Sequence, residues 1–142
     1  MAVTRRVAIL FVVLAFAPVG SLSAQLTANG VHANEPFCKT MVAQFVNMQT
    51  YMRSNFGRET DAKAQTKYFS EQKAFNALLL KQAPPSLSAD MALIDRDLKT
   101  SFEAMAHADR GHMAAAMAPM RTAQHLNAAQ HANAYCGLKV KK

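Results

Sequence analysis

The sequence predicts an all-α protein, an up-down-up-down four-helix bundle stapled by one disulfide bond. The chain of 142 residues is 51% hydrophobic and has only five glycines and five prolines. This composition excludes a disordered chain and argues against a turn-rich β-sandwich. Apolar residues recur every three or four positions in successive segments, which glycine or proline separates. The two cysteines, Cys38 and Cys136, fall at the start of the first segment and the end of the last.

Residues 1–24 have the pattern of a secretory signal peptide. Two arginines precede an apolar run from Val7 to Val19, and a small-residue cleavage site ends at Ala24. The run is shorter than the roughly 20 apolar residues that span a bilayer, so it predicts cleavage before Gln25 rather than an anchor. We therefore expect a secreted or extracytoplasmic protein with no transmembrane span after cleavage.

The first two helices follow a leader over residues 25–34, which we expect to be flexible because it is polar and has no apolar period. The first helix is expected over residues 35–55, because its apolar residues recur at alternating spacings of three and four. The second is expected over residues 60–83. Thr60 can cap its N-terminus, and two successive prolines cannot continue it.

The third helix is expected to begin near Ser86 and to stop at Gly111, within a bundle that spans residues 35–138. Its apolar stripe comprises Leu87, Met91, Ile94, Leu98, Phe102 and Met105. Four carboxylates are expected mainly on its outer side: Asp90, Asp95, Asp97 and Glu103. The bundle would therefore contain none of the inward-facing Glu-x-x-His pairs that a di-iron site requires.

The fourth segment is less regular than the others. Residues 112–118 predict a short helical turn, and Pro119 suits the first turn of a longer helix that runs to Tyr135. Gly137 can close that helix in the left-handed conformation that glycine adopts readily. Residues 139–142 then form a basic tail, which we expect to be solvated.

The cysteine pair agrees with this topology. In an up-down-up-down bundle, the first turn of the first helix and the last turn of the fourth are neighbours. Outside the cytoplasm two adjacent thiols oxidise, so we expect a bond between Cys38 and Cys136. Their wide separation in sequence argues against a redox-active Cys-x-x-Cys site.

Three short features mark the ends of the expected helices. They are Cys38 just inside the first helix, Pro84-Pro85 after the second, and Tyr135-Cys136-Gly137 at the end of the last. Over residues 34–138 this pattern resembles small exported helical proteins of actinobacteria. The resemblance implies an extracytoplasmic bundle with one cystine and carries over no functional residue. The secreted haem-carrier proteins of mycobacteria are similar in architecture only.

The distribution of charge and the absence of catalytic motifs limit the kinds of function that we expect. The formal net charge is +7, or +5 without the two arginines of the signal peptide. Basic residues are interleaved with acidic ones, so we expect no nucleic-acid binding. The basic tail could make weak contact with acidic surface polymers. The sequence contains no Gly-x-Ser-x-Gly, His-Glu-x-x-His or phosphate-binding glycine loop, so we expect no enzymatic activity.

A site of soft ligands is the sharpest functional hypothesis. If Cys136 faces inward, His125 does too, because eleven residues at about 100° each return to nearly the same face of a helix. In the bundle, Met48 and Met52 of the first helix would lie at the level of His125, with Tyr68 nearby. Imidazole and thioether groups can ligate haem iron or copper(I). They could equally be core filling, and we expect no resident cofactor.

A second group of soft side chains surrounds the turn between the third and fourth segments: Met105, His107, His112, Met113, Met117 and Met120. It could form a looser copper site. His131 lies towards the opposite face from His125. The sequence thus predicts an exported, non-enzymatic helical bundle that acts by binding an unidentified ligand or partner. A small haem or copper carrier and an enzyme of unrecognised type remain alternatives, and the oligomeric state is open.

Overall fold

The computed structural model describes residues 25–55, 61–109 and 111–141, and this part of the chain is mostly helical. The expected signal peptide lies outside it. The helices, in chain order, are α1 (Pro36–Asn55), α2 (Ala62–Gln82), the short 3₁₀ helix η3 (Pro85–Leu87), α3 (Ser88–His107), α4 (Met113–Ala116), the 3₁₀ helix η4 (Ala118–Arg121) and α5 (Ala123–Cys136). None of the helices in the described ranges is both long and apolar enough to cross a bilayer.

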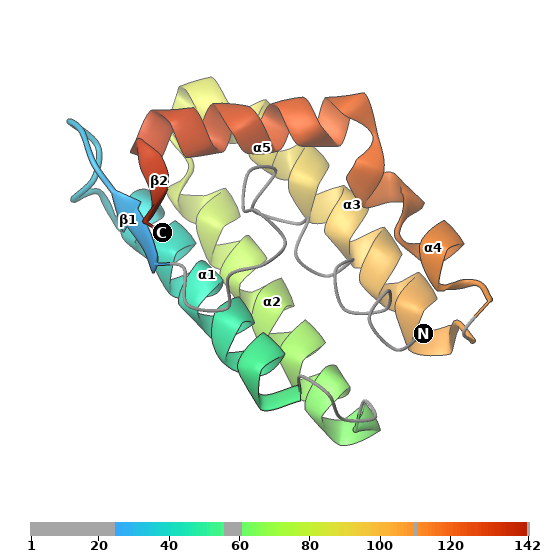
Figure 1. Cartoon of the computed structure of the whole chain (residues 1–142). Coiled ribbons are helices and arrows are strands. Elements are labelled where there is room, and N and C mark those ends of the chain that lie inside the picture. The colour runs from blue at the N-terminus through green and yellow to red at the C-terminus, as the bar shows by residue number, and fades with distance from the viewer. Residues whose placement is uncertain (1–24, 56–60, 110, 142) are drawn as a thin grey trace.

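The three long helices pack in chain order, with α2 between α1 and α3 (Figure 1). Helix α5 packs mainly on α3 and runs across the end of this layer instead of alongside α1 (Figure 1). The predicted all-α fold class is therefore confirmed, since most of the described chain is helical, but the up-down-up-down arrangement is not. The expected fourth helix is divided because Thr122 adopts an extended conformation, so Pro119 lies in η4 and the chain turns before α5 begins.

The ends of the helices follow from local chemistry. Asp61 caps α2 by accepting a hydrogen bond from the backbone N–H of Lys63, so the cap lies at Asp61 instead of the expected Thr60, which is outside the described residues. Thr122 caps α5 in the same way. At its other end, Gly137 adopts a left-handed φ of 58°, as predicted.

Two short strands tie the ends of the described chain together. Strand β1 (Gln25–Ala28) pairs antiparallel with β2 (Leu138–Lys141), so that Ala28 lies opposite Leu138. The leader expected to be flexible and the tail expected to be solvated thus contribute to one ribbon. Each segment alone has no apolar period. The disulfide joins the start of α1, which follows β1, to the end of α5, which precedes β2.

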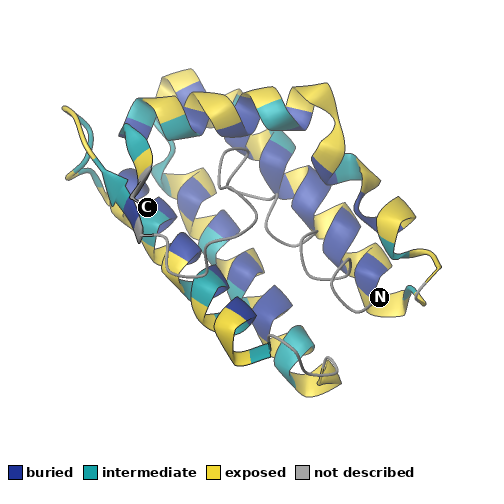
Figure 2. Cartoon of the chain, in the orientation of Figure 1, coloured by how far each residue is buried: buried dark blue, intermediate teal, exposed yellow. Residues whose placement is uncertain are grey.

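The buried residues form one core that all the long helices share (Figure 2). A polar network lies inside it between α1 and α2. The amide of Gln44 donates to the side-chain oxygens of Gln72 at 3.0 Å and Asn76 at 2.8 Å. The amide of Gln72 in turn donates to Asn47 at 2.9 Å. Because buried amides need hydrogen-bond partners, this network fixes the position of α1 along α2.

Candidate functional site at His125

His125 lies in the first turn of α5 and is completely buried. Its backbone N–H donates to the hydroxyl of Thr122, which orients this turn. Its ring nitrogen Nδ1 lies 3.0 Å from a carboxylate oxygen of Asp97 on α3. The prediction that His125 faces inward is confirmed. Its side-chain partner is a carboxylate that helical periodicity alone did not predict.

Asp97 is only 6% exposed, although its position in the helical repeat predicted the outer side of α3. That expectation was wrong for Asp97 and also for Asp95, because α2 and α5 cover more of α3 than its apolar stripe suggests. The other carboxylate oxygen of Asp97 accepts from Arg96, whose Nη2 lies 3.0 Å away. Asp90, Ile94 and Asp97 follow one another at spacings of four and three residues, so they lie on one side of α3. This spacing is the sequence signal that could have indicated a second buried side of the helix.

Two buried polar atoms near this contact have no hydrogen-bond partner. One is the second ring nitrogen of His125, Nε2, and the other is the hydroxyl oxygen of Ser101. Ser101 lies one turn after Asp97 on α3 and is also completely buried. If Nδ1–H of the neutral ring donates to Asp97, Nε2 carries an unused lone pair. Burying such an atom without a partner costs free energy, so Nε2 is the atom of this site at which a bound ligand would relieve that cost.

Two buried methionines precede α5 in the sequence. Met120 lies in η4 and Met117 is the residue before this helix, and both are almost completely buried in the shared core. The short helix η4 contacts both α3 and α5, which carry Asp97 and His125. We call the region where α3, η4 and α5 meet the His125 corner.

The methionines that were expected to face His125 lie elsewhere. Met48 and Met52 are buried in the second half of α1. Figure 1 shows that this half of α1 is far from the start of α5. Tyr68 is buried on α2, stacked on the ring of Tyr51 at 4.1 Å, and its burial raises the pKa of its hydroxyl. The structure does not bring these residues to His125, because α5 crosses the helices instead of lying along α1.

The second expected cluster is also divided. Met105 and Met117 are buried in the core, and Met113 is partly buried against it. His107 and His112 are exposed instead. Nδ1 of His112 lies 2.7 Å from a carboxylate oxygen of Asp109, and this contact holds the pKa of Asp109 below its ordinary value. The six side chains therefore do not converge on one point.

A small cavity lies where α1, α2, α3 and α5 meet. Two alanines of α5, Ala129 and Ala132, line it together with Gln44 and Asn76, and its volume is about 20 Å³. A cavity of this size has room for about one water molecule. Haem is far larger than this cavity.

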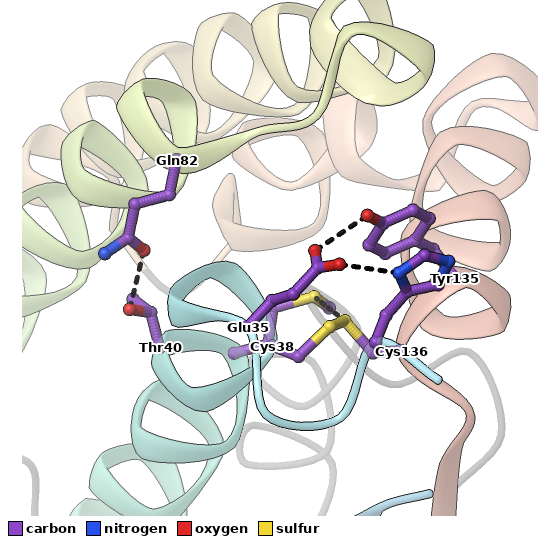
Figure 3. The surroundings of a disulfide bond; sticks show 8 residues. Glu35, Cys38, Thr40, Gln82, Tyr135 and Cys136 are labelled. Atoms are coloured by element: carbon purple, nitrogen blue, oxygen red, sulfur yellow. Dashed lines mark hydrogen bonds and ion pairs between the residues drawn. A yellow bond between two sulfur atoms is a disulfide. The ribbon is translucent and has the colours of Figure 1, made fainter. Parts of the chain in front are cut away.

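The disulfide end of the molecule is built around a polar clamp (Figure 3). Cys38 and Cys136 are bonded, as predicted, and they are 98 positions apart in the sequence. The hydroxyl of Tyr135 donates to Glu35 at 2.7 Å, and the ring of His32 stacks on Tyr135. The hydrogen bond from Tyr135 holds the pKa of Glu35 below its ordinary value and raises the pKa of Tyr135. The clamp fastens the segment before α1 to the last turn of α5.

The chemistry of the His125 corner is limited by its burial. Ser101, His125 and Asp97 are the residue types of a hydrolytic triad, but no hydrogen bond joins Ser101 to His125. Both side chains are fully enclosed, and a nucleophile must reach its substrate. In the described ranges, no group of three His, Cys, Asp or Glu side chains is arranged to hold a metal ion.

The chain matches no protein-family model, and no curated protein or solved structure is significantly similar to it.

Proposed function

We propose that this protein is exported and acts outside the cytoplasm by binding, without catalysing a reaction. Its disulfide supports this location, because such bonds persist in oxidising compartments. The pattern of residues 1–24 supports export through a cleaved signal peptide. The enclosed His125 corner favours binding over catalysis. A substrate would need an opening to reach the side chains, whereas a single ion can be held in an enclosed site.

Export makes a direct prediction about the N-terminus. We expect mature protein recovered from the culture medium or periplasm to begin at Gln25, because the small-residue site ends at Ala24. Edman sequencing or intact-mass analysis of the secreted protein checks this. Protein that begins at Met1 and stays in the membrane fraction would contradict it.

We propose copper(I) as the ligand, bound by His125 Nε2 with thioethers of Met117 and Met120. The observation that carries this proposal is the unpartnered, buried Nε2 on a ring whose Nδ1 contacts Asp97. Metal-binding histidines commonly have a carboxylate on their other nitrogen, which fixes the ring and raises its basicity. Copper(I) accepts low coordination numbers and prefers imidazole and thioether ligands.

Other ligands fit the corner less well. Zinc sites usually take four ligands from cysteine, histidine and carboxylate groups, and such a set is absent from the described residues. Haem would need space that the small cavity lined by the α5 alanines does not supply. The proposal therefore keeps the copper alternative predicted from the sequence but replaces Met48 and Met52 with Met117 and Met120.

Anaerobic titration with copper(I) in competition with a chromogenic chelator tests the site. We expect one equivalent to bind the unmutated protein, and His125→Leu to abolish binding because it removes the imidazole ligand. Met120→Leu should weaken binding while preserving the volume of the core. Asp97→Asn should lower the affinity by about 10- to 100-fold, as loss of such a carboxylate does in other metal sites.

His131→Leu is the matched control, since His131 also contacts an aspartate but is 64% exposed on its side chain. It should bind copper(I) as the unmutated protein does. Circular dichroism checks that each variant remains helical. Failure of the unmutated protein to bind copper(I), or equal binding by His125→Leu, would refute the site. A Soret band in protein purified from its source would instead favour a haem carrier.

A further inference from the structure

Asn29 and Gly30 form the one Asn-Gly pair in the sequence. They lie between the end of β1 at Ala28 and the start of α1 at Pro36, and both are exposed. Gly30 adopts a φ of 113°, which glycine tolerates and other residues rarely adopt. No atom beyond its chain neighbours lies within 4 Å of the place that a Cβ would take, so Gly30 is not crowded.

An asparagine that precedes an uncrowded glycine can react with its own backbone. The backbone nitrogen of Gly30 attacks the side-chain amide carbon of Asn29, and the new C–N bond closes a five-membered succinimide ring. The side-chain nitrogen leaves as ammonia and takes the proton of the attacked N–H. Solvent water then opens the ring at either carbonyl, which gives aspartate or isoaspartate without any oxidant or reductant. Asparagine is a thermolabile residue for reasons of this kind.

The structure sets Asn29 apart from other asparagines. Four of them lie inside long helices, where the following N–H belongs to the helical hydrogen-bond pattern: Asn47, Asn76, Asn127 and Asn133. Asn34 is exposed and precedes α1, but the N–H that follows it, that of Glu35, donates to the carbonyl of His32 at 3.0 Å. Within the described ranges, no backbone carbonyl accepts a hydrogen bond from the N–H of Gly30. The attacking nitrogen is therefore least restrained at Asn29.

The backbone of Asn29 holds the leader against the end of α5. Its N–H donates to the carbonyl of Gly137 at 3.1 Å, and its own carbonyl oxygen lies so close that a Cβ on Gly137 would clash with it. In isoaspartate the chain continues through the side-chain carbonyl, so the main chain gains one carbon atom. The former backbone carbonyl becomes a free carboxylate, with two oxygens and a charge where one carbonyl oxygen fits now.

We propose that Asn29 is a site of spontaneous deamidation and that its isoaspartate form releases the leader from the end of α5. The β1–β2 ribbon consists of four residue pairs and ends at Ala28, the residue before Asn29. A ribbon this short is marginal by itself, so it depends on the contacts at its ends. The disulfide keeps α1 joined to α5, and the release is therefore confined to the leader and the tail. The copper site plays no part in this proposal.

Peptide mapping of the disulfide-bonded protein after incubation at mildly alkaline pH tests the site. We expect Asn29 to gain about one mass unit as its amide becomes a carboxyl, and protein-isoaspartate methyltransferase to label the product. Asn34 is the internal control, because it lies in the same tryptic peptide, which ends at Lys39, and it should stay unmodified. Asn29→Gln should remove the modification, because the longer side chain would have to close a larger ring. Equal modification at Asn34, or equal labelling of the Asn29→Gln variant, would overturn the site.

Hydrogen exchange tests the structural consequence. Ion-exchange chromatography isolates the isoaspartate form by its added negative charge. We expect the amides of residues 25–28 and 138–141 to lose protection in this form, while those of α1 and α2 keep theirs. Freshly purified Asn29→Asp is the matched control, since it adds the same charge without lengthening the backbone, and it should keep the ribbon protected. Unchanged protection in the isoaspartate form, or an equal loss in Asn29→Asp, would overturn the release assigned to the longer backbone.

Discussion

Replacement of Cys38 by serine is expected to lower the free energy of unfolding by about 4–5 kcal/mol. The bond closes a loop with a sequence separation of 98, most of the chain that the structure describes, so its loss releases much conformational entropy in the unfolded chain. The β1–β2 ribbon should weaken as well, because the bond holds the start of α1 beside the end of α5. Urea unfolding followed by circular dichroism measures the loss.

The controls for this prediction use the partner cysteine and the oxidation state. Cys136→Ser should be destabilised as much as Cys38→Ser, and the double variant should be no less stable than either single variant. Intact-mass analysis should find the unmutated secreted protein about two mass units lighter than its reduced form. Free thiols in freshly secreted protein, or single variants as stable as the parent, would show that the bond does not form.

Replacement of Gly137 by alanine is expected to cost about 2–4 kcal/mol. Its φ of 58° is in the left-handed region, which disfavours a side chain. A Cβ at this position would also lie 1.7 Å from the carbonyl oxygen of Asn29, whose N–H donates to the carbonyl of Gly137 at 3.1 Å. The backbone of Asn29 would have to move, and the adjoining ribbon would be disrupted.

Gly111→Ala is the matched control, since the nearest atom to a Cβ there is a side-chain oxygen of Asp109 at an ordinary 3.5 Å. It should leave the unfolding midpoint nearly unchanged. Thermal or urea unfolding of the two variants side by side measures the difference. Equal midpoints for the Gly137 and Gly111 variants would contradict the role assigned to the close approach of Asn29.

Local interactions explain which features could be predicted from the sequence. The starts and ends of the helices follow from prolines, glycines and short polar caps, whose effects act within a few residues. The bond between Cys38 and Cys136 followed from the cysteine count and from export chemistry. The inward position of His125 followed from its helical phase relative to Cys136, which depends only on the regularity of one helix.

The packing of α5 against the other helices was decided by tertiary structure alone. The extended conformation at Thr122 turns the chain between η4 and α5, and the sequence around Pro119 is compatible with a continuous helix as well. Because α5 crosses α3, His125 meets Asp97, and the helix that packs beside its own is α3 instead of α1, which carries Met48 and Met52. Helical periodicity assigns a residue to one face of its helix. Which other helix packs on that face depends on the directions in which whole helices cross, and many weak contacts determine those directions together.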